Sequence, residues 1–242
     1  MSFLESKYLY FGLLLFSLAY PIAQSFEWRI RYYTKWKRLF PAIGVMTLIF
    51  IPWDIWFTKV GVWWFNDDYI SGFKLFKLPV EEWLFFVVVP FACIFIYEVL
   101  IYFIKKDLLY SIAQPFFIIT GLVLLITAIY YHQQLYPFVT FSLTSIALFA
   151  CAYFNPHWKG RFLMMYLVSW IPFLIVNGAL TGNFTKAATV NYNPEEIIGI
   201  RITTIPVEDS VYNLLMLLIV VAVYEYQNNS SINPRIWNKV FR

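Results

Sequence analysis

The sequence is poor in charge, histidine and cysteine, and each shortage excludes a class of protein. Only 13% of the 242 residues are charged, about half the share found in a typical soluble domain. Two histidines, His132 and His157, are too few for a histidine-rich metal site. The two cysteines, Cys93 and Cys151, lie inside apolar runs, where a small core residue is the simplest interpretation. We therefore expect neither a metal site nor a disulfide framework.

The sequence motifs of common cofactors are missing as well. The chain has no G-x-G-x-x-G fingerprint for a dinucleotide and no Walker loop for a nucleotide. It lacks the D-D-x-x-D motif expected of a diphosphate-using enzyme, because Asp67-Asp68 is only a pair. The last apolar segment contains no lysine that could hold retinal. We expect no cofactor, and the net charge of +4 gives no reason to expect nucleic-acid binding.

Apolar and aromatic residues are abundant instead, at 61% and 22% of the chain. A membrane-spanning helix needs about 20 mostly apolar residues. Once the segments that meet this requirement are removed, no soluble domain remains. We predict an all-α polytopic membrane protein with seven transmembrane helices at residues 8–26, 40–57, 79–104, 110–131, 135–154, 162–181 and 206–227.

The basic residues predict the orientation of the chain. Twelve of the 18 lysines and arginines fall on one side of the predicted membrane. The positive-inside rule then places the N-terminus outside and the C-terminus in the cytoplasm. We expect an integral cell (inner) membrane protein whose first segment is a retained signal anchor. The cytoplasmic set is Arg29, Arg31, Lys35, Lys37, Arg38, Lys105, Lys106, Lys159, Arg161, Arg235, Lys239 and Arg242.

One short phrase occurs twice. Leu78-Pro79-Val80-Glu81-Glu82 begins the third segment, and Ile205-Pro206-Val207-Glu208-Asp209 begins the seventh, 127 positions later. The two segments end on Tyr97-Glu98 and Tyr224-Glu225 at the same offset. We predict two parallel three-helix repeats joined by a linker helix, with boundaries at 1–107, 108–133 and 134–242. Parallel repeats are related by an axis along the membrane normal, so both phrases should emerge on the same, outer side.

The paired acids are the candidate catalytic residues. A helix start accounts for one copy of the phrase, because proline suits the first turn and acids favour the positive end of the helix dipole. Two copies favour a functional role. Neighbours on a helix point about 100° apart, so at most one acid of each pair faces a central cavity. Identity between the repeats favours Glu81 and Glu208, with Glu82 and Asp209 as the next choice. Acids that meet in an apolar cavity can divide into a general acid and a base.

Weaker candidates surround the acids. Asp54 and Asn177 could each orient an acid of the same repeat by hydrogen bonding, or could equally be interfacial turn residues. Glu98 and Glu225, about 25 Å away, are expected to snorkel to the opposite interface. Nearby aromatic rings would suit either a carbocation or an ordinary membrane interface. The aromatic candidates include Trp83, Phe85, Phe86 and Tyr212.

The doubled P-x-E-[ED] phrase, the seven segments and the parallel duplication resemble the membrane-integral lycopene cyclases, made from two homologous subunits or from one chain fusing both. The run from Glu81 to Phe86 is similar to the first-subunit pattern, whereas Ser210-Val211-Tyr212-Asn213 departs from it. The resemblance implies proton-initiated, redox-neutral cyclisation of the linear ends of lycopene to β-ionone rings, through γ-carotene to β-carotene. It also implies a lipid-dissolved carotenoid substrate, a membrane-lipid environment and association with other carotenoid enzymes.

Two other functions stay open from the residues alone. A proton-coupled transporter would also place acids on repeat-related helices, although its acids would be expected near the membrane midplane. A carotenoid-binding or assembly protein is the other alternative. Within the resembling family, ε-ring formation and longer carotenoid substrates also stay open.

Overall fold

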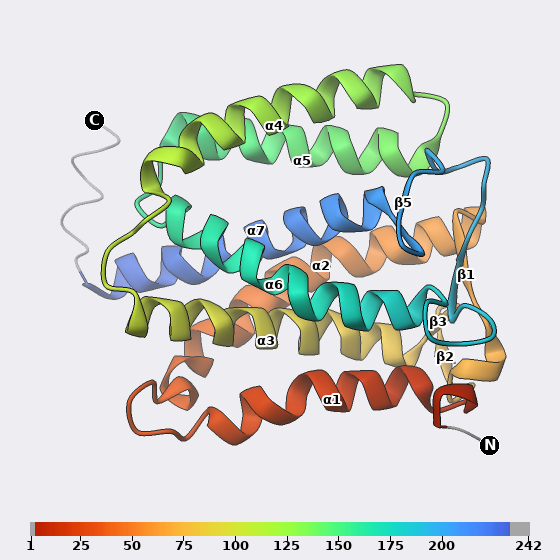
Figure 1. Ribbon diagram of the computed structural model, residues 1–242. Coiled ribbons are helices and arrows are strands. Elements are labelled where there is room, and N and C mark those ends of the chain that lie inside the picture. Colours follow the sequence, from red (N-terminus) through yellow and green to blue (C-terminus); the bar gives the residue numbers. More distant parts are fainter. Residues whose placement is uncertain (1–2, 233–242) are drawn as a thin grey trace.

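The protein consists of long helices that run side by side in the computed structural model (Figure 1). The model describes residues 3–232, and the side chains of residues 4–227. Three short 3-10 helices, η1 (Phe3–Glu5), η2 (Tyr32–Lys35) and η3 (Asp67–Tyr69), lie in this part of the chain. The seven α-helices within it are α1 (Leu9–Gln24), α2 (Trp36–Val60), α3 (Val80–Phe103), α4 (Tyr110–Tyr130), α5 (Leu135–Phe154), α6 (Lys159–Leu180) and α7 (Val207–Ile232).

The predicted all-α polytopic membrane fold is confirmed. Six of the helices, α2 to α7, are long and apolar enough to cross a membrane. Helix α1 is shorter than its predicted segment, at 16 residues. It ends where the Ser25 hydroxyl donates to the Pro21 carbonyl at 2.7 Å, a bond that closes the last turn. Three of the basic residues used to predict the orientation, Arg235, Lys239 and Arg242, lie outside the described residues.

The repeated phrase builds the same local structure twice. Pro79 has an extended backbone, with φ −62° and ψ 149°, directly before α3. A hairpin precedes each acidic helix, formed by β2 (Lys74–Leu75) with β3 (Leu78–Pro79) and by β5 (Arg201–Ile202) with β6 (Ile205–Pro206). The backbone N–H of Val80 donates to the Phe73 carbonyl, and that of Val207 donates to Ile200 in the same way. Both acid pairs therefore begin their helices in the same geometry.

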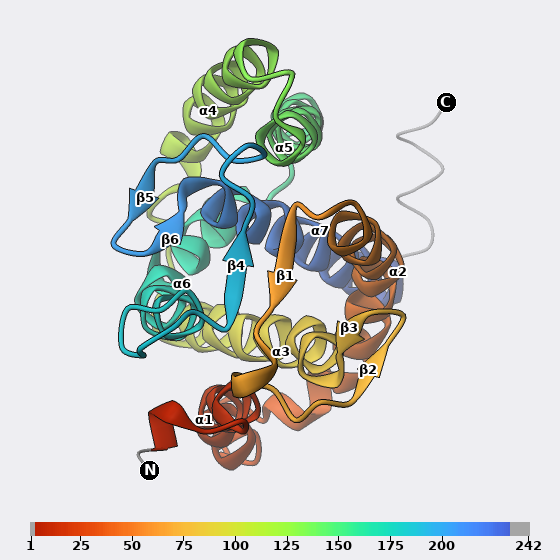
Figure 2. The same cartoon turned by 90° about the vertical axis from the view of Figure 1, so that its right-hand side faces the viewer.

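The long loops of the two repeats join into a cap over one end of the helices. Strand β1 (Trp63–Phe65) lies between α2 and α3, and β4 (Val190–Tyr192) lies between α6 and α7. The strands pair antiparallel, with Trp63 opposite Tyr192, across the end of the bundle that faces the viewer in Figure 2. We call this end, where α3 and α7 begin, the acid end.

At the opposite end, α3 and α7 exchange hydrogen bonds. The Tyr97 hydroxyl donates to Glu225 Oε1 at 2.7 Å, and the Tyr224 hydroxyl donates to Glu98 Oε1 at 2.5 Å. Each tyrosine thus binds the glutamate that follows the other tyrosine in the sequence. Glu225 is only 5% exposed, so the prediction that it snorkels to an interface is wrong for this glutamate, and the hydrogen bond from Tyr97 lets its carboxylate stay inside the bundle. Glu98 is partly exposed and lies 3.9 Å from Lys35 Nζ.

The linker helix α4 packs beside α5 and α6. Gly160 allows a close approach to its start, since a Cβ at this position would lie 2.4 Å from the Tyr110 backbone nitrogen. The Lys159 ammonium group is buried here, donates to Gln114 Oε1 at 3.0 Å, and lies 4.2 Å from the centre of the Tyr110 ring. These contacts hold α4 against the second repeat, while the boundaries at 107/108 and 133/134 stay a prediction.

Candidate active site

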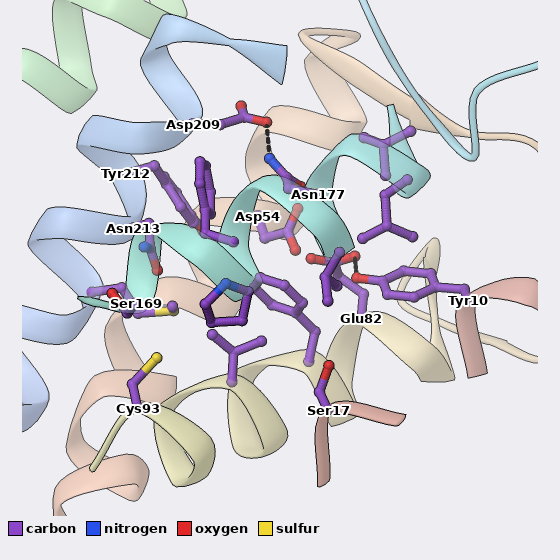
Figure 3. Close-up of a pocket in the computed structure, with 18 of the residues that line it drawn as sticks. Tyr10, Ser17, Asp54, Glu82, Cys93, Ser169, Asn177, Asp209, Tyr212 and Asn213 are labelled. Carbon is purple, nitrogen blue, oxygen red and sulfur yellow. Dashed lines mark hydrogen bonds between the residues drawn. The ribbon is translucent and has the colours of Figure 1, made fainter. Parts of the chain in front are cut away.

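A cavity begins under the cap and extends along the helices toward the middle of the bundle (Figure 3). Its empty volume, open mouth included, is about 970 Å³. On α3 the lining residues run from Glu82 to Ile96 at helical spacing, which is about 21 Å along the axis. Below the acid end the walls are mainly apolar, with Val89, Phe173 and Met216 among them. This shape suits a long apolar molecule with one end at the acids.

The first repeat contributes a pair of carboxyl groups. The Asp54 and Glu82 side chains lie side by side on the cavity wall (Figure 3). The Tyr10 hydroxyl donates to Glu82 Oε2 at 2.6 Å, and the Trp63 indole N–H donates to Asp54 Oδ1 at 2.7 Å. Two neighbouring carboxyl groups in an apolar cavity repel each other when both are ionised, so this arrangement favours a proton on one of them.

The second repeat contributes a single carboxyl group with three donors. Asp209 is 7% exposed. Its Oδ1 accepts from the Tyr136 hydroxyl at 2.8 Å, and its Oδ2 accepts from Asn177 Nδ2 at 2.8 Å and from the Tyr192 hydroxyl at 2.6 Å. Burial, together with the neighbouring Asp209, raises the pKa of Tyr192 well above its usual range, so Tyr192 stays a donor. Asp209 is thus held entirely as an acceptor.

The two sets correspond through the repeat. Tyr10 lies on α1 and Tyr136 on α5, and each donates to the second acid of its own repeat. The second helices contribute Asp54, which lies beside Glu82, and Asn177, which donates to Asp209. The main chemical difference is that a carboxyl group in one repeat is an amide in the other. The same framework therefore holds two neighbouring carboxyl groups on one side and a single carboxyl group on the other.

The prediction that Glu81 and Glu208 are the acids facing the cavity is wrong. Glu82 and Asp209 line the cavity, whereas Glu81 and Glu208 point into the loops. Glu81 Oε1 accepts from the Ser71 backbone N–H at 2.7 Å, and Glu208 Oε1 accepts from the Ile198 N–H at 2.6 Å. Both side chains are fully buried. The identity of this glutamate in the two repeats is thus explained by an identical loop contact.

The other predicted residues divide between the cavity and the packing around it. Asn177 hydrogen-bonds Asp209, as one of the two interpretations expected, Asp54 lies beside Glu82, and Phe85 and Tyr212 line the cavity. Trp83 and Phe86 do not line it. The Trp83 indole donates to the Leu75 carbonyl at 3.4 Å, and Phe86 is buried against Phe50.

Four hydrogen-bond donors at the acids were not among the predicted site residues. For Tyr10 and Tyr136 a signal existed, because both lie near the starts of corresponding segments, 126 positions apart. Tyr192 gave none, since it lies in a loop whose strand pairing the sequence did not predict. Nothing in the sequence distinguishes Trp63 from the many other aromatic residues. Within the described residues, no group of three or more histidine, cysteine, aspartate or glutamate side chains is placed to hold a metal ion.

Fold and site together define a polytopic membrane protein whose two parallel repeats meet at a carboxyl-lined cavity. The family model described as "Lycopene cyclase" matches residues 7–100 and again residues 133–227. The chain therefore belongs to the lycopene cyclase family. The segment between the two matches contains α4, in agreement with a linker between two repeats. Comparison with curated proteins and with solved structures gives no match. Family membership supports a carotenoid cyclase function in a membrane, with a carotenoid as substrate.

Proposed function

We propose that this chain is a lycopene β-cyclase, in which the Asp54–Glu82 pair is the acid and Asp209 is the base. The observation that carries this assignment is the difference between the repeats. One repeat places two carboxyl groups side by side, which favours a proton on one of them, and the other surrounds a carboxyl group with three donors. Of the four acids in the two phrases, Glu81 and Glu208 are assigned the role of holding the loops.

The reaction needs only proton transfers. Glu82 delivers the proton of the pair to the terminal double bond of the linear end group, which gives a tertiary cation. A double bond further along the chain attacks this cation and closes a six-membered ring, moving the positive charge into the ring. Asp209 removes a proton from a ring carbon beside the charge, and a new double bond forms. Return of that proton from Asp209 to the pair resets the site, so the reaction is redox-neutral.

The surroundings support a carbocation mechanism. Tyr212 lines the cavity, and its ring contacts those of Phe50, Trp53 and Trp63, with centroids 4.9 to 6.1 Å apart. Aromatic faces stabilise cations, by about 2 kcal/mol when desolvated. The β1–β4 cap covers the acid end, which limits capture of the cation by water. A lipid-dissolved substrate would enter from the membrane rather than through the cap.

The acids of both repeats line the same cavity. We infer that the two ends react in separate binding events, with the monocyclic product, γ-carotene, as the intermediate. We further propose that the acid end faces the outside and that the C-terminus is cytoplasmic, as the distribution of basic residues predicts.

Expression in a lycopene-accumulating bacterium tests the function. The wild-type chain should convert lycopene to γ-carotene and then to β-carotene, and Asp209→Asn should leave lycopene unchanged at the same membrane level. Chromatography against standards separates these products. Unchanged lycopene with verified wild-type protein in the membrane contradicts the proposal, and an ε-ring product would retain a cyclase but contradict the β-ring assignment.

A further inference from the structure

Asn213 presents an amide to the cavity that nothing in the protein satisfies. Its side chain is 6% exposed and lines the cavity, as Figure 3 shows. Among residues 4–227, this side chain makes no hydrogen bond. Of the neighbouring polar groups on the cavity wall, the Ser169 hydroxyl donates to the Tyr166 carbonyl at 2.7 Å, whereas the buried Tyr212 hydroxyl has no partner within the described residues.

Packing does not account for an asparagine at this position. A buried amide without partners is unfavourable, because it loses its hydrogen bonds to water and gains none in return. The corresponding residue of the first repeat, 127 positions earlier, is Phe86, which is fully buried in the core. An apolar side chain would therefore be the stable choice at residue 213. The amide points to a role toward the molecule that fills the cavity.

Asn213 is close to the proposed base. It follows Asp209 by four residues on α7, so the two side chains lie on the same face, about 6 Å apart along the axis. Asp209 is at the acid end, and Asn213 is one turn farther into the cavity, toward its apolar part. A ring that reacts beside Asp209, with its chain in the apolar part, would bring the ring carbon that bears the chain toward Asn213.

We propose that Asn213 contacts the reacting end group and determines which ring proton is lost. This inference rests on the proposed function. The ring cation has two ring neighbours that can lose a proton, the carbon that bears the chain and the methylene on its other side. Loss from the chain-bearing carbon gives the β ring, and loss from the methylene gives the ε ring. The partly negative amide oxygen of Asn213 stabilises positive charge on the chain side of the ring, and so directs Asp209 to the proton there.

Asn213→Leu tests this role, with Leu217→Met as the control because it changes a buried residue of α7 that does not line the cavity. In lycopene-producing cells, Asn213→Leu should lower the rate about tenfold and shift the products from β toward ε rings. Leu217→Met should retain the wild-type rate and ring type. Asn213→Ala, which adds no bulk, should give the same shift in ring type as the leucine variant.

Thermal unfolding in detergent separates this role from a structural one. Removal of an unsatisfied amide should leave the unfolding temperature of Asn213→Leu equal to or above that of the wild type. A lower unfolding temperature with unchanged ring composition would assign Asn213 to the fold and overturn the inference, as would wild-type rate and products in both variants. A wild-type chain that leaves lycopene unchanged would instead contradict the proposed function itself.

Discussion

The adjacent residues Glu81 and Glu82 allow a comparison in which the same chemical change has two different consequences. Glu82 lines the cavity, where its carboxyl group lies beside that of Asp54. Glu81 points away from the cavity and accepts from the Ser71 backbone N–H at 2.7 Å. Each is changed to glutamine, which keeps the size of the side chain but cannot donate a proton as an acid.

Glu82→Gln should change the reaction barrier, whereas Glu81→Gln should change the unfolding free energy. General acid catalysis contributes about 10²- to 10⁴-fold, so Glu82→Gln should raise the barrier by about 3–5 kcal/mol. Glu81→Gln keeps an acceptor oxygen for Ser71 and loses only the charge assistance of that bond. The loss should be about 1 kcal/mol of unfolding free energy, or a few degrees in unfolding temperature for a chain of this size, with cyclase activity within a fewfold of the wild type.

The assay combines product formation with stability. Lycopene conversion is measured in membranes containing equal amounts of each variant, and thermal unfolding is followed on the purified proteins in detergent. A Glu81→Gln variant that is inactive but normally stable, beside an active Glu82→Gln variant, would refute the assignment. The corresponding pair in the second repeat, Glu208→Gln and Asp209→Asn, should divide in the same way.

Three further predictions concern the surroundings of the site and the membrane. Tyr136→Phe and Tyr192→Phe each remove one hydrogen-bond donor from Asp209. Because hydrogen bonds to charged groups contribute about 1.5–3 kcal/mol, each variant should lower kcat by roughly 10- to 100-fold without loss of fold. Wild-type kcat in both variants would contradict the role of these donors. Tyr97→Phe and Tyr224→Phe should each lower the unfolding free energy by about 1–3 kcal/mol, measured by denaturation in detergent. Both variants should leave kcat unchanged, since both residues lie at the end opposite the acids. A variant with native stability would show that the exchanged hydrogen bond is dispensable. Reporter enzymes fused to the two termini should report the N-terminus outside and the C-terminus in the cytoplasm, and the opposite result would overturn the predicted orientation.

The fold could be predicted because two strong signals coincide in this sequence. Long apolar runs predict where the helices lie, and the phrase repeated at a constant offset predicts which helices of the two repeats correspond. The weakest prediction concerned α1, whose 16 residues leave it outside the six described helices that are long enough to cross a membrane. The strand pairing of the cap was invisible, because β1 and β4 are three residues each and lie in loops far apart in the sequence.

The site could be predicted in outline but not in orientation. The phrase identified the correct helix turns, and the 100° between neighbours correctly limited each pair to one acid in the cavity. Identity between the repeats then favoured Glu81 over Glu82, because identity was taken as a sign of chemistry. In the structure, the identical residues make an identical loop contact, and the residues that differ between the repeats face the cavity. The glutamate that is identical in both repeats therefore reflects the loop contact that both halves share, and not a role in the reaction.

The inward acid has a carboxyl neighbour in the first repeat, where Asp54 lies beside Glu82, and an amide neighbour in the second, where Asn177 lies beside Asp209. This difference limits how such a site can arise. Two identical copies of either half, joined about the same axis, would hold two pairs of neighbouring carboxyl groups or two lone carboxyl groups. The first arrangement has no free base, and the second has no ready acid. Proton donation on one side and removal on the other therefore require two sequences that differ at this point. Duplication provides the cavity, and divergence at the residue beside each inward acid gives the two sides of the cavity opposite roles.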